Sequence, residues 1–253
     1  MRKIPSGIVI FAILLILTAT QEQLIAQVNS SFDYNHWASV LERFVDDNGL
    51  VDYKALKAQP DGLNDFIGQI EQADLSGMSE TGQKAFWINA YNAITLKVVT
   101  DKYPIGQIRF INFGLVWEIS RSVARGEKSL GEIEHKTLRP LGDARIHFAI
   151  NCASMGCPKL SREPFLPQTL DEQLDAQAVR FINDPEKVRL ERQAKVLYYS
   201  SIFKWFEKDF LKAAPSVKAY IMKYINEEDR LFLEQNEVKM KVLKYDWGLN
   251  EQP

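Results

Sequence analysis

The segment Ala85–Ala93 places two asparagines inside a strongly apolar, aromatic stretch of the chain. Start signals at Ser79 and the apolar pattern that follows predict a helix from there to about Thr100. Asn89 and Asn92 are three residues apart and therefore lie on one side of it. Buried amides are costly unless they are hydrogen-bonded. They either orient a catalytic side chain or a substrate carbonyl, or they satisfy buried backbone where the helix meets a sheet.

The composition favours one folded domain. The chain has 253 residues, of which 46% are hydrophobic and 25% charged, a profile that excludes disorder and low-complexity repeats. The net charge of -2 excludes the basic surface that a nucleic-acid-binding protein needs. With only two cysteines, the fold depends on its hydrophobic core rather than on a disulfide framework. We expect a single domain over residues 27–253.

The first 26 residues resemble a secretory signal. Arg2 and Lys3 precede a run of ten apolar residues, Ile8–Leu17, which is too short for a spanning helix of roughly 20 residues but suits a signal peptide. Cleavage after Ala26 leaves an exported, weakly acidic chain in the periplasm or outside the cell, with no membrane span. The alternative is an uncleaved anchor.

Hydrophobic periodicity and turn signals predict an α+β fold, in which helices pack on a mostly antiparallel sheet. The expected helices cover residues 37–45, 61–73, 79–100, 129–138, 170–182, 203–211 and 217–225. The expected strands are two short segments within 108–119, then 145–150, 187–190, 196–200 and a closing hairpin of 230–234 with 238–245.

Both cysteines lie in one stretch, Asn151–Pro158, directly after the expected strand 145–150. Cys152 is the candidate nucleophile, and backbone amides in Ala153–Gly156 would receive an oxyanion. A thiol requires a base to form the thiolate. Because strand residues alternate, His147 points to the face opposite Cys152, so His135 is the favoured base and His147 the second choice.

Two other interpretations of the cysteines remain open. Cys152 and Cys157 are close enough in sequence to form a small disulfide loop in an oxidising compartment, which would remove both thiols. Alternatively, the two cysteines could bind zinc together with His135 and His147, although four intervening residues lie at the edge of the usual ligand spacing.

Glu134 has several candidate roles. It either orients His135 or holds Arg139 or Arg145. With Glu118 it could also form the carboxylate pair of a glycosidase, but the sequence does not show that the two flank a cleft. Glycine-rich phosphate loops and metalloprotease histidine spacing are absent from the sequence, so we expect no cofactor and no metal.

Several segments together resemble the family called domain of unknown function 547. They cover most of the chain after the signal. They are residues 37–53, 86–93, 133–135, 147–154, 203–206, 209–210 and 245–250.

The resemblance implies an exported bacterial protein and a set of conserved motif positions, although the family has no settled reaction. The matching positions are Asn89, Tyr91, Asn92, Glu134, His135 and Cys152. His147 and Cys157 fit the bacterial form of the pattern. The resemblance therefore favours a Cys152–His135 pair over the disulfide.

The combination of thiol, imidazole and polar orienter also has a distant likeness to the papain and transglutaminase-like architecture. The chain order differs, because those enzymes usually carry the cysteine on the early helix. Here that helix carries Asn89 and Asn92, and Cys152 follows the histidines. The likeness is thus either a rearranged site or architectural only.

These residues predict a thiol-dependent hydrolase or acyltransferase that acts on an amide or ester in the cell envelope. Cys152 would be the nucleophile, His135 the base, and Glu134, Asn89 or Asn92 the orienter. The expected substrate-binding residues are Tyr91, Trp87, His147 and Ser154. The alternative is a non-catalytic module that binds an envelope peptide, glycan or small molecule.

Overall fold

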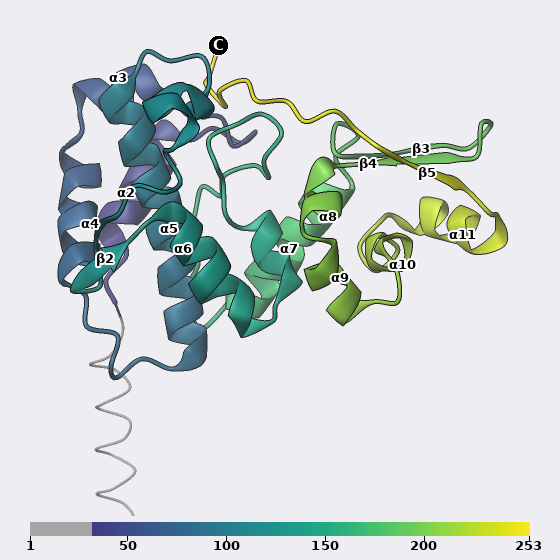
Figure 1. Ribbon diagram of the computed structural model, residues 1–253, viewed down its shortest axis with the longest axis horizontal. Coiled ribbons are helices and arrows are strands. Elements are labelled where there is room, and N and C mark those ends of the chain that lie inside the picture. Colours follow the sequence, from purple (N-terminus) through teal and green to yellow (C-terminus); the bar gives the residue numbers. More distant parts are fainter. Residues whose placement is uncertain (1–31) are drawn as a thin grey trace, which may run out of the picture.

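Helix α5 (Glu80–Lys102) is the buried centre of the first half of the structure. Figure 1 presents the computed structural model, which describes residues 32–253; the signal expected at residues 1–26 lies outside them. The Ser79 hydroxyl accepts a hydrogen bond from the Gly82 amide at 3.0 Å and caps the helix. The neighbouring elements are α2 (Asn35–Phe44), α3 (Tyr53–Ala58), α4 (Asp61–Gln72), α6 (Leu130–Glu132) and the π-helix η2 (Ile133–Leu138).

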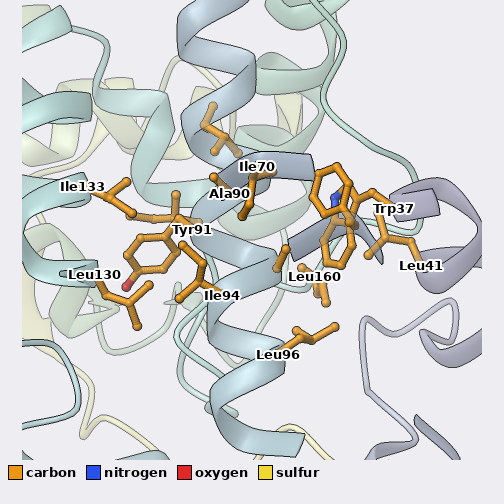
Figure 2. Close-up of a cluster of buried hydrophobic side chains, with 14 of the residues drawn as sticks. Trp37, Leu41, Ile70, Ala90, Tyr91, Ile94, Leu96, Leu130, Ile133 and Leu160 are labelled. Atoms are coloured by element: carbon orange, nitrogen blue, oxygen red, sulfur yellow. The ribbon is translucent and has the colours of Figure 1, made fainter. Parts of the chain in front are cut away.

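Helix α5 is covered on both sides, which explains why its sequence is apolar around its whole circumference. In Figure 2, Trp37 and Leu41 of α2 lie on one side of α5, and Leu130 and Ile133 lie on the other, next to Tyr91. All five side chains belong to the same hydrophobic cluster.

The second half of the structure has its own hydrophobic cluster, centred on aromatic side chains such as Phe148, Phe203 and Phe210. A small sheet has the order β3-β4-β5, with β3 and β4 antiparallel and β4 and β5 parallel. The elements of this half are α7 (Leu170–Ile182), β3 (Val188–Glu191), β4 (Val196–Tyr199), α8 (Ser201–Trp205), α9 (Glu207–Ala213), α10 (Val217–Ile221), α11 (Glu227–Gln235) and β5 (Lys239–Val242).

The C-terminal segment 243–253 returns from β5 to the first half of the molecule, as the yellow trace in Figure 1 shows. There Glu251 forms a parallel bridge with Val51, and the Tyr53 hydroxyl donates a hydrogen bond of 2.7 Å to the Asn250 side chain. This segment therefore connects the two halves.

The structure confirms the α+β class. It also confirms the helices expected over 61–73, 79–100 and 170–182 and the strands over 187–190 and 196–200 to within a few residues. The helices expected over 203–211 and 217–225 are α8 with α9, and the shorter α10. Within residues 32–253, no helix has both the length and the apolar character needed to cross a membrane.

The two strands expected within 108–119 were wrong. Residues Ile108–Gly114 form the 3-10 segment η1, in which Asn112 and Phe113 both have positive φ. The hairpin lies later, as β1 (Arg121–Val123) and β2 (Gly126–Lys128). Its turn residues, Ala124 and Arg125, also have positive φ, without the Asn or Gly that usually marks such a turn. Tertiary contacts support it, because the Ala124 and Arg125 amides donate to the carbonyls of Ile70 and Glu71 on α4.

The strand expected over 145–150 was also wrong, because residues Ala144–Phe148 form the 3-10 helix η4. The Asp143 carboxylate accepts a hydrogen bond from the Arg145 amide at 3.0 Å and caps it. Ile146 belongs to the first hydrophobic cluster and Phe148 to the second. The apolar residues of this segment therefore pack into two cores rather than on one face of a sheet.

The closing hairpin was wrong as well. Residues 230–234 lie inside helix α11, which Asn226 caps by accepting a hydrogen bond from the Asp229 amide at 3.0 Å. Strand β5 pairs with β4 in parallel. Parallel pairing requires a crossover rather than a tight turn, and the connection through α8, α9, α10 and α11 provides it.

Candidate functional site

A cavity of about 320 Å³ is lined by residues of both halves of the structure. We call it the aromatic pocket, after the six aromatic side chains in its wall. These are Tyr91, Trp117, Trp205, Phe206, Tyr245 and Trp247. The volume lies at the lower end of the range of small-molecule sites, about 300–1,000 Å³.

Four titratable side chains also line the aromatic pocket: Glu118, Glu134, His135 and His147. No lysine or arginine is among the described residues that line it. The polar part of the wall is therefore acidic or neutral.

A capping box positions two of these groups. The Ser129 hydroxyl accepts from the Glu132 amide at 3.2 Å, and the Glu132 carboxylate accepts from the Ser129 amide at 3.1 Å, as the Ser-x-x-Glu spacing predicts. The chain continues directly into the π-helix η2, which carries Glu134 and His135. Single-turn π-helices are frequent at functional sites.

His147, on η4, lines the aromatic pocket. Its ring stacks on Phe206 with centroids 3.9 Å apart, and its Nε2 lies 3.0 Å from Oδ2 of Asp209. Asp209 also accepts a hydrogen bond of 2.6 Å from Arg139. Arg139 and His147 together hold the pKa of Asp209 down at about 2, against the effect of its burial, so it is ionised at neutral pH.

Glu134 faces the other nitrogen of His147. Its Oε1 lies 4.0 Å from Nδ1, and this Nδ1 is buried without a hydrogen-bond partner among the described residues. Burial raises the pKa of Glu134 to about 7, in spite of the nearby Arg139. Burial lowers the pKa of His147 to about 4, although Asp209 acts in the opposite direction. At neutral pH the imidazole is uncharged and donates Nε2–H to Asp209, which leaves Nδ1 as an acceptor.

Glu134 does not hold either arginine. Arg145 pairs instead with Asp143, Asp171 and Asp175, and Arg139 pairs with Asp209. His135, the favoured base, has its Nδ1 3.3 Å from Nη1 of Arg139. Burial, with Arg139 second, lowers the pKa of His135.

The two cysteines form a disulfide, so the alternative with a small bridged loop describes this structure. Both cysteines line the aromatic pocket. The Tyr245 hydroxyl lies 3.3 Å from the Cys152 sulfur and 3.1 Å from the Cys157 sulfur. In this form Cys152 has no thiolate to act as a nucleophile or a zinc ligand. Within residues 32–253, no group of three or more His, Cys, Asp and Glu side chains is arranged to hold a metal ion.

The amides expected to receive an oxyanion have other partners. The Ala153 amide donates to the Asn151 side chain at 2.7 Å. The Met155 and Gly156 amides donate to the carbonyls of Gly248 and Asp246 at 2.7 and 2.8 Å. Three of the four expected donors are therefore engaged in this structure, two of them by carbonyls of the C-terminal segment.

Asn89 and Asn92 are buried outside the aromatic pocket and bind mainly backbone. Asn89 accepts from the Trp37 indole and the Phe165 amide. Asn92 accepts from the Asn151 amide at 2.8 Å and donates to the Ala149 carbonyl at 3.0 Å. Asn92 thus fixes the start of the cysteine loop, which is the backbone-satisfying role that the sequence left open.

The expected substrate-binding residues are divided. Tyr91 and His147 line the aromatic pocket. Ser154 does not line it, but its hydroxyl lies 2.8 Å from that of Tyr245, which does. Trp87 lies elsewhere, where the Lys128 ammonium sits 5.6 Å from its ring centroid.

Sequence reasoning gave no site role to Asp209, Trp205, Tyr245 or Trp247. Their segments, 203–210 and 245–250, carry part of the family resemblance. This resemblance was the one sequence signal that could have pointed to a role of these residues in the site. What the sequence could not supply was their approach to His147 and Glu134, which lie more than 55 residues earlier in the chain.

Residues 75–182 match the family model described as "Protein of unknown function, DUF547". The matched range contains Glu134, His135, His147 and both cysteines, whereas Asp209 and the Trp205–Tyr245–Trp247 cluster lie beyond it. No curated protein and no solved structure matches the chain, so the likeness to papain and transglutaminase-like enzymes stays a prediction. The match over residues 75–182 supports the resemblance to the domain of unknown function 547 family.

Proposed function

We propose that this protein is exported and binds a peptide or glycan segment of the cell envelope in the aromatic pocket, without forming a covalent bond to it. The observation that carries the proposal is that six aromatic side chains line one cavity. Aromatic rings supply large apolar contact areas at low entropic cost, and mostly apolar pockets with a few polar groups are typical ligand sites.

Two further contacts favour binding over covalent catalysis. The bond between Cys152 and Cys157 occupies the candidate nucleophile. The Met155 and Gly156 amides are engaged by the C-terminal segment. The candidate nucleophile and two of the candidate oxyanion donors are therefore engaged in structural bonds.

Calorimetric titration of the mature protein with short glycans and short peptides tests the proposal. Trp205 is half exposed and stacks with Tyr245 and Trp247, so Trp205→Ala should weaken binding by about tenfold, as truncating an aromatic anchor usually does. Phe113→Ala is the matched control, because Phe113 is fully exposed and does not line the pocket. Equal loss in both variants, or in neither, would contradict binding in the aromatic pocket.

A thiol-dependent hydrolase or acyltransferase is the second candidate. The observation that favours it is that Cys152, His135 and Glu134 all line the same cavity. This function requires prior reduction of the disulfide to release the thiol. Amide and ester substrates would then be turned over only with reductant, and Cys152→Ser would abolish turnover. Turnover that persists in Cys152→Ser would exclude Cys152 as the nucleophile.

A further inference from the structure

The polar groups of the aromatic pocket define the ligand more narrowly than its aromatic wall does. We infer that the ligand presents an alkylammonium group, which lies against the rings of Trp205, Tyr245 and Trp247 and pairs with the Glu134 carboxylate. This inference rests on the proposed binding function, for which it names the ligand chemistry.

The aromatic wall of the pocket presents ring faces that attract a cation. Tyr245 lies 4.7 Å from Trp205 and 4.6 Å from Trp247, measured between ring centroids, so the three rings form one continuous surface. The Arg109 guanidinium already lies 5.6 Å from the Trp247 centroid. Tryptophan and tyrosine faces attract cations, and aromatic sites are a common means of binding alkylammonium groups.

The Glu134 carboxylate would supply the negative charge that pairs with the bound ammonium group. The Glu134 side chain is only 12% exposed, and its one ionic contact among the described residues is the 4.0 Å approach to His147. A buried carboxyl group without a cationic partner is costly to ionise. A bound ammonium group would supply the missing charge, whereas an anionic ligand would meet no lysine or arginine in the wall.

The groups around Glu134 do not supply that charge. The positive charge of Arg139 is matched by Asp209 at 2.6 Å. His147 is neutral above its pKa of about 4, and burial lowers the pKa of His135. The nearby hydroxyls of Tyr91 and Tyr245 stay protonated, because burial raises the pKa of both. Glu118, in the same wall, adds a second acidic group.

Ammonium binding should therefore release a proton. Free Glu134 has a pKa of about 7, and a bound cation favours the ionised carboxylate. If binding requires that form, the affinity for the cation rises as the pH rises, by about tenfold between pH 6 and pH 8.

NMR titration of the mature protein with choline and with Nα-acetyl-lysine amide tests the inference, since the first represents a free small molecule and the second a peptide side chain. The neutral isostere 3,3-dimethylbutan-1-ol has the shape of choline without its charge. We expect at least one ammonium probe to bind several-fold more tightly than the isostere, and the tenfold pH effect to apply only to the ammonium probe.

Variants localise the effect. Glu134→Gln should abolish the pH dependence and weaken ammonium binding, whereas Glu127→Gln, on the exposed β2, should change neither. Trp205→Leu provides an independent test, because its ring is half exposed and its loss should be tolerated by the fold.

The inference would be overturned if neither ammonium probe bound more tightly than the neutral isostere, if the Glu134→Gln variant behaved as the unchanged protein does, or if neither ammonium probe bound at all. If glycans or uncharged peptides still bind in a manner that depends on Trp205, the proposed function stands without it.

Discussion

Glu134 and His147 reverse the order in which the two side chain types normally ionise. The reference pKa values are 4.5 and 6.5, whereas burial raises the pKa of Glu134 to about 7 and lowers the pKa of His147 to about 4. Between pH 4 and pH 7 the pair of Glu134 and His147 holds one proton, and in the folded protein that proton resides on the carboxyl group. A neutral pair in the pocket wall is the physical result, because burial disfavours both charged forms.

The reversed pKa values of Glu134 and His147 predict opposite pH dependences of stability in two single variants. Glu134→Gln leaves His147, whose lowered pKa gives stability above pH 6.5 that is lost as the pH falls through 4. His147→Gln leaves Glu134, whose raised pKa gives stability below pH 4.5 that is lost as the pH rises through 7. Each change amounts to at most about 3 kcal/mol, and in the wild type the two nearly cancel between pH 4.5 and 6.5. Urea unfolding at a series of pH values between 4 and 7 measures the free energy of unfolding of each variant. Parallel pH dependences in the two variants would contradict the reversed order of the pKa values.

At the scale of elements, local signals were sufficient for some parts of the fold. The long helix α5, the helix α7 and the capping box at Ser129 follow from periodicity and side-chain caps that lie within a few residues of each other. The hairpin β1–β2 and the 3-10 helix η4 do not. Their conformations depend on α4 carbonyls in one case and on burial in two different cores in the other, and neither is visible in a local sequence window.

The candidate site also depends on contacts between residues that are far apart in the sequence. The sequence identified Glu134, His135, His147, Cys152 and Tyr91, all of which line the aromatic pocket. It did not supply partners such as Asp209 and Tyr245, because these come from distant elements. Residue type was therefore informative, and pairing required the fold.

Replacing the cap of α6 should affect both stability and the pocket. Ser129→Ala removes the capping hydrogen bond and should lower the free energy of unfolding by about 1 kcal/mol. Because η2 follows that cap directly, the titration of Glu134, measured by carboxyl NMR, should shift as well.

Ser79→Ala is the matched control, since Ser79 caps α5 in the same way but does not line the aromatic pocket. We expect a similar loss of stability in that variant and no change in the Glu134 titration. A shift in both variants would mean that the effect is not local to the cap of α6.

At the scale of the whole molecule, two hydrophobic clusters are joined by a chain segment that returns from the second half to the first. The C-terminal segment pairs with the cysteine loop and places Tyr245 and Trp247 in the pocket wall. Both halves of the structure supply residues to the pocket wall. The shape of the pocket therefore depends on how the two halves are positioned relative to each other.

Asn250→Ala should weaken this connection. It removes the buried partner of the Tyr53 hydroxyl, and an unsatisfied buried group costs about 1–3 kcal/mol. Asn64→Ala, on the exposed face of α4, is the control. Thermal unfolding monitored by circular dichroism measures both, and equal stability of the two variants would show that the Tyr53–Asn250 contact does not hold the halves together.

The path of the C-terminal segment also has a consequence for the order of events in biosynthesis. Glu251 and Asn250 complete contacts with Val51 and Tyr53, some two hundred residues earlier. The first half therefore cannot complete these contacts until Asn250 and Glu251 have been synthesised. The pocket wall, to which Tyr245 and Trp247 contribute, should likewise be completed only after these residues have been synthesised.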